Sequence, residues 1–442
     1  MNRKLIFLFL MLPALTAVGQ EKRTLSLTDA IDLGIKNSKQ LRGDTAKIAE
    51  AAAELQQAID RKLPSASVTG SYLQIVSSGN INLKSSNNNN SGNNGGGPPK
   101  IHEAVYGLVN VSLPVYAGGK IQYGIESSRL LKKAIELDAD REKDDIIQNT
   151  IESFANLFKA TSAVRLAEEN LATSKQRVSD LSNLEKNGLL ARNDLLKAEL
   201  QSSNIELTLL DAQNNLEMTN LNMDLLLGLP TTTTLQLDTT GIERKNDPRV
   251  MEDFVQAAYH NRKDLEATDL RKQAAEIAVK TTRAEKYPNI ALTGGYIAAD
   301  IPKFLTVTNV VNVGVGVSYN IASLWNNKAK VAQSTAKVQE IQATQDLLND
   351  NIRRQVSQGY LTMISNRKKI DVYAKALEQA NENYRIVKNK FDNNLATTTE
   401  LLEADVAQMQ ARLAYTLARA DAFVAYNKLL QTAGLLSTEL KK

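Results

Sequence analysis

The strongest constraint on this chain is that it contains one motif twice. Residues 62–72 read KLPSASVTGSY and residues 286–296 read KYPNIALTGGY, and the two share five of eleven positions. The offset between Pro64 and Pro288 is 288 − 64 = 224. Upstream of the two copies, LTDAIDLGIKNSKQL and MEDFVQAAYHNRKDL align at the same offset. A repeat of this extent predicts that both halves of the chain fold on one plan.

The alignment continues downstream at a second offset, 206. NVSLPV at 110–115 aligns with GVSYNI at 316–321, and NGLLARNDLLKAEL at 187–200 with NNLATTTELLEADV at 393–406. The difference, 224 − 206 = 18, is an insertion in the first copy, which the Asn/Gly/Pro-rich residues 87–99 supply. Such a tract cannot bury a core and predicts a flexible surface loop.

Each copy contains two segments in which apolar and polar residues alternate. In VNVGVGVSYNI, residues 311–321, every second residue is apolar or aromatic, and the others are Asn, Gly or Ser. This period of two predicts β-strands at about 65–77, 103–117, 289–299 and 308–322. A membrane-crossing strand needs about 9–11 residues of this pattern, but a half-buried strand of a soluble sheet has the same pattern.

The segments that follow the strands predict long helices. Pro and Gly are absent from residues 129–186, which would give roughly 87 Å of helix at 1.5 Å per residue. After a turn near 188, residues 195–226 place apolar or small residues at steps of three and four, the rhythm of a coiled coil. A second stripe beside this one would let the helix pack on both flanks, as in a ring of helices. The second copy repeats the rhythm at 401–432, after a turn near 394.

The expected fold class is therefore mixed α and β, with the order helix, strand, loop, strand, long helix, tight turn, helix in each half. The first structural repeat covers 20–248 and ends in an additional segment at 229–248. The second structural repeat covers 249–442.

The first residues, MNRKLIFLFLMLPALTAVGQ, predict export. A basic start, an apolar stretch and small residues before the cleavage site are typical of a secretory signal peptide, here at 1–19. Beyond it no run of 18 apolar residues occurs, so no membrane-spanning helix is expected. An exported chain without such a helix is either soluble beyond the inner membrane or inserted as β-structure.

Composition argues against several other functions. The 53 basic and 49 acidic residues nearly balance, so no nucleic-acid partner is expected. The chain has no cysteine, hence no disulfide and no thiolate metal site. His102 and His260 stand in different segments, and GGK at 118–120 lacks the flanking residues of a phosphate-binding loop. We therefore expect no enzyme activity, no catalytic residue, no metal and no cofactor.

Four strands are too few to close a barrel. Lipid offers no partner to the backbone at an open sheet edge, and the smallest membrane barrels have about eight strands. If the strands lie in a membrane, several copies of the chain must therefore share one barrel. An ordinary coiled-coil dimer would explain the helices but would leave the strands unexplained.

The order of these features resembles that of the outer membrane efflux protein family, the TolC-like outer-membrane channels. The resemblance rests on the signal peptide, the duplicated halves, LPVYAGGK after the second strand, NGLLARNDLLKAEL at the helix turn and LLLGLP closing the first half. It covers essentially the whole mature chain. The specificity lies in the order, spacing and duplication of these motifs, because no single one is very specific.

The resemblance implies a homotrimer in outer-membrane lipid. Its 12-stranded β-barrel would continue as a long 12-helix periplasmic α-barrel, with the segment 229–248 in a belt around the helices. Family members are passive exit ducts, coupled through a periplasmic adaptor (membrane fusion) protein to an inner-membrane transporter. The expected function is therefore passive conduction of small molecules from the periplasm to the exterior, as part of a tripartite efflux pump.

Two alternatives stay open at this point. The same duct could serve a type I protein secretion system. A soluble periplasmic coiled-coil scaffold or adaptor is an alternative of a different class. Such an adaptor should carry a compact lipoyl-like β-domain between its helices, and the sequence has no sign of one.

The helix turns are the first candidate site. Gly188-Leu189-Leu190 and Asn394-Leu395-Ala396 occupy the places where family members meet the adaptor. Gly and Asn tolerate the left-handed backbone of a tight helix end, and Leu189 and Leu190 would leave apolar side chains exposed there. Simple helix capping explains the Gly and the Asn equally well, but not the exposed leucines.

Carboxylates close to these turns are the second candidate site. Glu400 and Glu403 are spaced i, i+3 on one helix face, and family members constrict the entrance with an acidic pair here. Like charges in a narrow pore attract cations and resist full ionisation, although the pair could equally lie on a solvated helix face. The family's bracing aromatic hydroxyl and arginine are replaced by Phe391 and Ala396, so any latch made by Asp194 must use other partners.

Overall fold

The computed structural model describes residues 22–74, 76, 102–239, 247–302 and 305–440. The expected signal peptide at 1–19 and the Asn-rich residues 87–99 lie outside these ranges.

The chain divides into two compact units, and each unit takes segments from both halves of the sequence. The sheet unit comprises the described residues of 45–138 and 264–348. The hairpin unit comprises the described residues of 1–44, 139–263 and 349–442.

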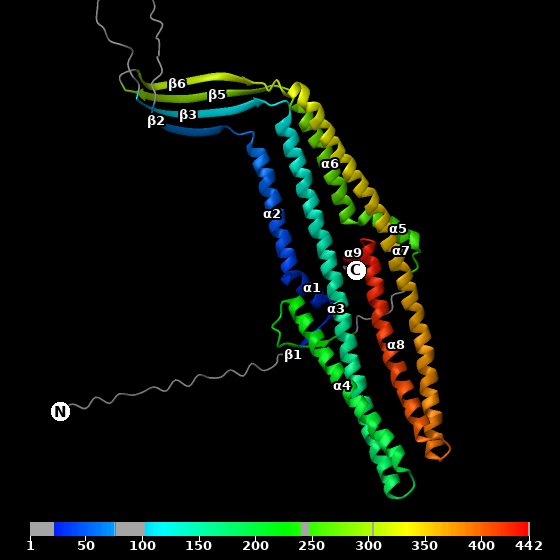
Figure 1. Ribbon diagram of the computed structural model, residues 1–442. Helices are drawn as coiled ribbons and strands as arrows, with labels where there is room; N and C mark the ends of the chain where they lie inside the picture. Colours follow the sequence, from blue (N-terminus) through cyan, green and yellow to red (C-terminus); the bar gives the residue numbers. More distant parts are fainter. Residues whose placement is uncertain (1–21, 75, 77–101, 240–246, 303–304, 441–442) are drawn as a thin grey trace, which may run out of the picture. The chain divides into compact units, whose positions relative to one another are not determined.

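The sheet unit contains four antiparallel strands in the order β2-β3-β5-β6 (Figure 1). Their bounds are Ser65–Gln74, Glu103–Tyr116, Asn289–Ile301 and Leu305–Ser318. The central pair, β3 with β5, joins the first half of the chain to the second. Within the described residues β2 and β6 each pair on one side only, so they are the two edges of the sheet.

The strand ends differ from the predicted ones. β2, β5 and β6 end at Gln74, Ile301 and Ser318, whereas the sequence predicts about 77, 299 and 322. The early end of β6 has a local cause in Asn320. The Oδ1 of Asn320 accepts from the N–H of Ala322 (3.1 Å), and its carbonyl accepts from the N–H of Ser323 (3.0 Å). This turn takes the backbone out of the sheet and into the next helix.

The strand register gives the sheet two different faces. One row of opposed residues across all four strands consists of Val68, Val109, Tyr296 and Val311. The next row consists of Ser67, Asn110, Gly295 and Asn312. Adjacent rows point to opposite faces, so one face is apolar and the other is lined largely by hydroxyls, amides and glycines. Larger apolar residues interrupt this second, mixed face, among them Leu73, Leu108, Ile297 and Val310.

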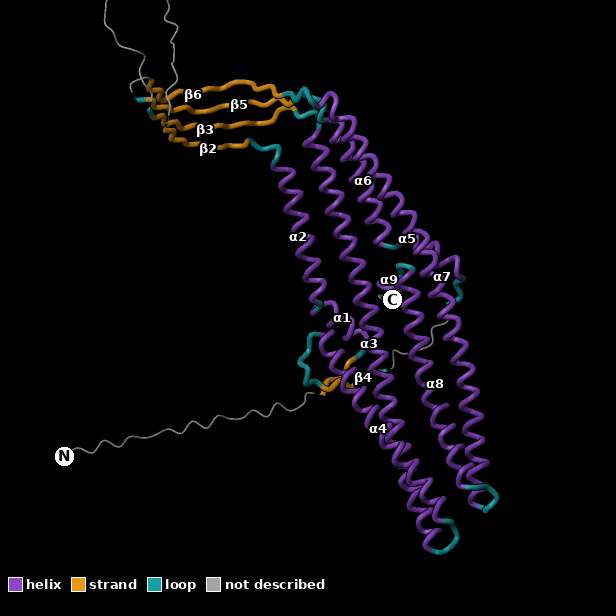
Figure 2. The backbone as a smooth tube through the Cα atoms, in the orientation of Figure 1, coloured by secondary structure: helices purple, strands orange, loops and turns teal. Residues whose placement is uncertain are grey.

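The hairpin unit contains two helix hairpins, α3 with α4 and α7 with α8 (Figure 2). Their bounds are Lys120–Lys186, Arg192–Leu227, Ser323–Asp392 and Thr398–Thr432. The first parts of α3 and α7 belong to the sheet unit. α3 begins before the Gly-free stretch that starts at residue 129 and includes Gly124.

The remaining described elements are shorter than these helices. β1, α1 and α2 cover Lys22–Leu25, Leu27–Asn37 and Lys39–Asp60. β4, α5, α6 and α9 cover Thr234–Leu237, Met251–Asn261, Lys263–Ala284 and Leu436–Glu439. No helix in the described ranges combines the length and the apolar composition needed to cross a lipid bilayer.

Apolar side chains hold each hairpin together. Near the turn of the first hairpin, Leu181 of α3 packs with Leu195 and Ala198 of α4. In the second hairpin, Ile370 of α7 packs with Ala418 and Ala422 of α8. The members from α4 and α8, Leu195, Ala198, Ala418 and Ala422, lie at the three- and four-residue steps that predicted a coiled coil, because such steps keep one face of a helix against its neighbour.

The segment between α4 and α5 is anchored at both ends by equivalent residues of the two repeats. Asn220 of α4 donates to the carbonyl of Thr233 (2.7 Å) and accepts from the N–H of Leu235 in β4 (3.0 Å). Tyr426 of α8, at the equivalent position 220 + 206 = 426, donates to the carboxylate of Asp247 (3.1 Å). β4 also pairs in parallel with β1, so several bonds fix the described parts of this segment.

Two glycines allow a matched test of this packing. Gly434 and Gly188 both have left-handed backbones, with φ of 68° and 70°. A Cβ on Gly434 would lie 2.9 Å from the backbone carbonyl carbon of Asn261, whereas a Cβ on Gly188 would meet nothing within 4 Å. We expect Gly188→Ala to lower the free energy of unfolding by about 1 kcal/mol through backbone strain alone. Gly434→Ala should lower it further, and equal losses in unfolding experiments in detergent would contradict the described contact.

Candidate functional site: the helix tips

Both hairpin turns have the same backbone geometry. In the first tip the N–H groups of Gly188 and Leu189 donate to the carbonyls three and five residues before them, at 2.9 Å each. In the second tip Asn394 and Leu395 do the same at 2.9 and 2.7 Å. Gly188 and Asn394 have positive φ, 70° and 58°. This Schellman motif satisfies the last helix carbonyls and explains the residue types at the two positions.

One leucine of each tip is strongly exposed. The exposed fractions of Leu189 and Leu395 are 73% and 77%. Leu190, in contrast, is half-buried and packs against the cluster of Leu181, Leu195 and Ala198. The expectation of an exposed side chain is therefore wrong for Leu190, because the chain turns back at Gly188 and directs that residue onto the hairpin core. Ala396 of the second tip is half-buried.

Glu400 closes the N-terminus of α8. Its Oε2 accepts from the N–H (2.7 Å) and the hydroxyl (2.9 Å) of Thr397, and its own N–H donates to the Thr397 hydroxyl (3.2 Å). The bond from the Thr397 N–H, followed by that from the hydroxyl, lowers the pKa of Glu400. This arrangement is a capping box. The Thr-x-x-Glu signature is visible in the sequence, and reading it would have assigned this role.

The other predicted carboxylates have different surroundings. Glu403 is exposed and has no hydrogen-bond or ion-pair partner in the described part of the chain. Asp194 forms an ion pair with Lys197 (3.1 Å), whose ammonium also donates to the hydroxyl of Thr399 (3.3 Å). Lys197 therefore connects the first tip to the second. The structure brings Asp194 close to α8 through this lysine and shows no direct bond from it to Glu400 or Glu403.

The two hairpins meet along a largely polar row between α3 and α8. Its side-chain contacts are Asp145–Gln431, Lys159–Asp421, Glu169–Arg412, Asn170–Met409 and Arg177–Asp405. An apolar contact is added at the tip, where Phe391 and Leu402 pack on the cluster of the first hairpin. Phe423 of α8 also packs on the apolar cluster that includes Phe154 and Leu157 of α3, so the two hairpins meet through polar pairs and apolar side chains together.

Arg177 and Asp405 form the most buried ion pair of this row. Its guanidinium donates to the carboxylate of Asp405 (2.7 Å) and to the hydroxyl of Tyr384 (2.9 Å), which links α3, α8 and α7. The exposed fractions of the Arg177 and Asp405 side chains are 11% and 8%. Sequence reasoning missed this triad. The repeat gave no signal either, because the residue equivalent to Asp405 (405 − 206 = 199) is the exposed Glu199.

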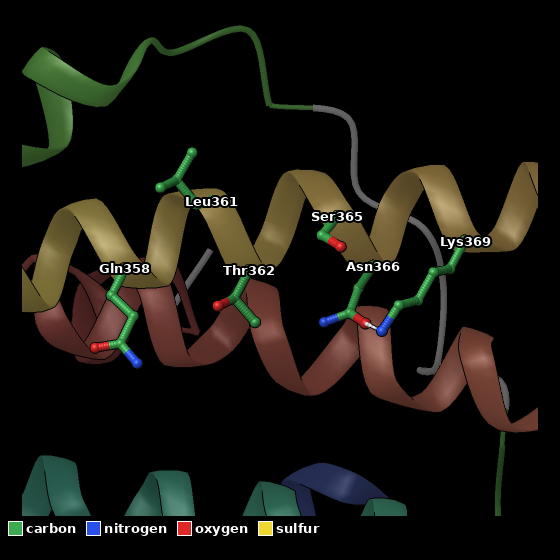
Figure 3. A pocket seen from close by; sticks show the side chains of 6 residues that line it. All are labelled: Gln358, Leu361, Thr362, Ser365, Asn366 and Lys369. Atoms are coloured by element: carbon green, nitrogen blue, oxygen red, sulfur yellow. Dashed lines mark hydrogen bonds between the residues drawn. The ribbon is translucent and has the colours of Figure 1, made fainter.

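A groove on α7 is a further candidate, and Figure 3 shows the side chains that line it. They are Gln358, Leu361, Thr362, Ser365, Asn366 and Lys369. Lys369 donates to the Asn366 Oδ1 at 3.5 Å, and none of these six residues is acidic, so the described lining contains no acid–base pair. In the described ranges no group of three or more His, Cys, Asp or Glu side chains is placed to hold a metal ion.

The four-stranded sheet and the duplicated helix hairpins together define the protomer fold of TolC-like outer-membrane channels. Residues 254–435 match the model of the outer membrane efflux protein family. The resemblance and the mixed α and β fold expected from the sequence are confirmed.

Solved structures of outer-membrane channels have the same fold. The CmeC outer membrane channel of Campylobacter jejuni has a TM-score of 0.77 and 17% identity, over 94% of this chain and 88% of its own. The outer membrane protein VceC of Vibrio cholerae has a TM-score of 0.75 and 17% identity, over 92% and 96%. The open-state MtrE outer membrane channel of Neisseria gonorrhoeae has a TM-score of 0.72 and 16% identity, over 93% and 89%. A comparison with curated proteins found no match.

The Arg177 triad generates a stability prediction. Arg177→Met would leave Asp405 buried without its partner, and we expect the free energy of unfolding to fall by about 3–5 kcal/mol. The double variant Arg177→Met/Asp405→Leu should recover much of this loss, because no unpaired charge remains. Lys197→Met is the control at an exposed pair and should change stability by less than about 1 kcal/mol. Denaturant unfolding of the full chain in detergent measures all three, and a stable Arg177→Met variant would contradict the burial of the pair.

Proposed function

We propose that this chain is one protomer of a trimeric outer-membrane duct that passively conducts small molecules from the periplasm to the exterior. The observation that carries the proposal is the four-stranded sheet, in which an exposed apolar face lies opposite a mixed polar face. The family match of residues 254–435 and the channel fold support it.

The apolar face of the sheet suits lipid. Val68 and Val313 are 81% and 79% exposed in the protomer, and other exposed members of this face are Tyr72, Val111, Val311 and Val315. Soluble proteins rarely leave so large a contiguous apolar patch uncovered. The opposite face offers hydroxyl and amide groups, as expected of strands that line a water-filled lumen.

The edges of the sheet support a shared barrel. β2 and β6 each leave one row of backbone groups unpaired within the described chain, which is unfavourable in lipid. Because the four strands alternate in direction, β6 of one copy and β2 of the next would meet antiparallel. Copies can therefore add without changing the pattern, and three copies would give 3 × 4 = 12 strands.

The helices also present surfaces for a second copy. α4 has an exposed apolar stripe at Leu196, Leu200, Leu207 and Leu210, and α7 has exposed apolar residues at Leu347, Leu361 and Val372. Exposed acidic residues lie along α4, at Glu199, Glu206 and Glu217, and exposed basic residues along α7, at Arg353, Lys368 and Lys369. We assign α4 of one copy to α7 of the next, a heterologous contact that closes into a ring.

The tips are the proposed contact with a periplasmic adaptor, which would couple the duct to an inner-membrane transporter. Leu189 and Leu395 are the exposed apolar anchors of this site, and Gly188 and Asn394 set the turns. Leu190 and Ala396 are partly buried, and their side chains would stabilise the turns by packing against the hairpins. Glu403, together with Glu400 and Asp194, is the proposed constriction at the entrance.

The lipid-facing role of the sheet is tested by two neighbouring substitutions. Val313→Asp places a charge on the apolar face, whereas Asn312→Asp places it on the mixed face of the same strand. A charge against lipid is unfavourable, so we expect Val313→Asp to abolish recovery in the outer-membrane fraction and Asn312→Asp to retain it. Equal recovery of both variants would contradict the proposed orientation.

The constriction is tested by conductance in a planar lipid bilayer. We expect wild-type pores to prefer cations and Glu403→Ser to reduce the cation-to-anion permeability ratio, since it removes a carboxylate from each copy. Glu400→Gln keeps a capping oxygen and removes the charge, so its comparison with Glu400→Ser separates selectivity from capping. An unchanged cation-to-anion permeability ratio in Glu403→Ser would contradict the proposed constriction. Folded protein that is soluble without detergent and forms no pores would favour a periplasmic scaffold instead.

A further inference from the structure

Asp224, close to the C-terminus of α4, is a buried carboxylate with no countercharge among the residues that the structure describes. Its exposed fraction is 0%. One oxygen, Oδ2, accepts a hydrogen bond from the side-chain amide of Asn220 (3.0 Å). The other, Oδ1, has no hydrogen-bond partner among the described residues. Such burial disfavours the ionised form of a carboxyl group.

The elements around this end of α4 supply apolar side chains. Met223 and Leu227, on either side of Asp224, belong to a cluster with α1, α3, β1 and β4 whose buried members also include Leu25, Ala30, Phe154, Leu157 and Leu235. Burial alone raises the pKa of Asp224 to about 6.

The charged groups on these elements do not compensate Asp224. On α1, Asp29 accepts from Ser26, while Asp32 and Lys36 are exposed. On α3, Glu152 accepts from Gln148, and Lys159 pairs with Asp421 of α8. On β1, Arg23 is exposed.

The repeat shows that this position does not need a carboxylate for packing. The equivalent residue of the second half, at 224 + 206 = 430, is Leu430, which is 2% exposed. A leucine thus fills the equivalent place in α8, the second helix of the second hairpin. The first half therefore has a titratable side chain, Asp224, at a position that an apolar side chain fills in the second half.

Asp224 is coupled to β4 through a shared partner. The side-chain amide of Asn220 donates both to Asp224 (3.0 Å) and to the carbonyl of Thr233 (2.7 Å). The Oδ1 of Asn220 accepts from the N–H of Leu235 in β4, and Leu235 pairs with Arg23 of β1. A change in the charge of Asp224 therefore acts on the residue that holds the β1–β4 pair against the hairpin.

We propose that Asp224 is a pH-responsive anchor, whose neutral form fixes the β1–β4 pair to α4 and whose ionised form loosens it. The neutral carboxyl leaves no uncompensated charge in the apolar cluster, so the contact between the β1–β4 pair and α4 is stable at low pH. The folded pKa of about 6 lies above the ordinary value of 3.8. The stabilisation that the neutral Asp224 carboxyl gives to the fold is therefore fully present below about pH 4, and it is lost as the pH rises through about 6.

Hydrogen exchange of the full chain in detergent, between pH 4.5 and 7.5, tests this inference. After correction for intrinsic exchange rates, the opening equilibrium of β4 in the wild type should rise roughly 30-fold between pH 4.5 and 7.5, given the shift from 3.8 to about 6. Asp224→Asn, which is isosteric and cannot ionise, should show no such rise. Asp224→Leu copies the residue of the second repeat and should also be independent of pH.

Asp211→Asn is the control, because Asp211 is exposed on the same helix and its loss changes the net charge equally. It should retain the wild-type response. The same pH dependence in the wild type and in Asp224→Asn would overturn the proposal, and so would its loss in Asp211→Asn. The measurement does not involve conductance, so its outcome is independent of the proposed duct.

Discussion

Backbone pairing at the two edges of the four-stranded sheet is the constraint on which the proposed assembly depends. The backbone groups of β3 and β5 pair with each other across the two halves of the chain. Within the described residues, β2 and β6 each have backbone groups along one side that pair with no other strand. In water such an edge can pair with another chain, and in lipid its unpaired backbone N–H and C=O groups are energetically unfavourable. Under the proposed function, the exposed apolar face of the same sheet lies in lipid, so these edges lie there as well. Both features call for further copies of the chain.

The hairpin unit divides its interactions differently. Apolar clusters hold α3 to α4 and α7 to α8, whereas the contact between α3 and α8 is mainly a row of polar pairs with Arg177 and Asp405 at its most buried point. The duplication accounts for the common plan of the hairpins. The two repeats differ in the charged side chains that they carry at equivalent positions. Asp224 of the first half corresponds to Leu430, and Glu199 corresponds to Asp405 of the second half.

Much of the fold was predictable because its signals are local. Alternation gave the strands, the absence of Pro and Gly gave the long helices, and Gly188 and Asn394 gave the turns. The end of β6 was not predictable from alternation, since Asn320 turns the chain while the pattern continues to Ile321. Leu190 and the Arg177–Asp405 pair depend on contacts between helices, and the latter joins residues 228 positions apart. The burial of Asp224 follows from elements that pack around the end of α4, so no local pattern of the sequence indicates it.

Cysteine cross-linking between the sheet edges tests the central claim most directly. The chain has no cysteine, so any disulfide must come from introduced residues. Ser67→Cys on β2 would be combined, one variant at a time, with cysteines along β6 at residues 310–316, and outer-membrane fractions would be oxidised and separated under denaturing conditions. The account predicts cross-links between chains that build a ladder ending at three copies. Cross-links confined to one chain, or no cross-link in a folded protein found in the soluble fraction, would contradict it.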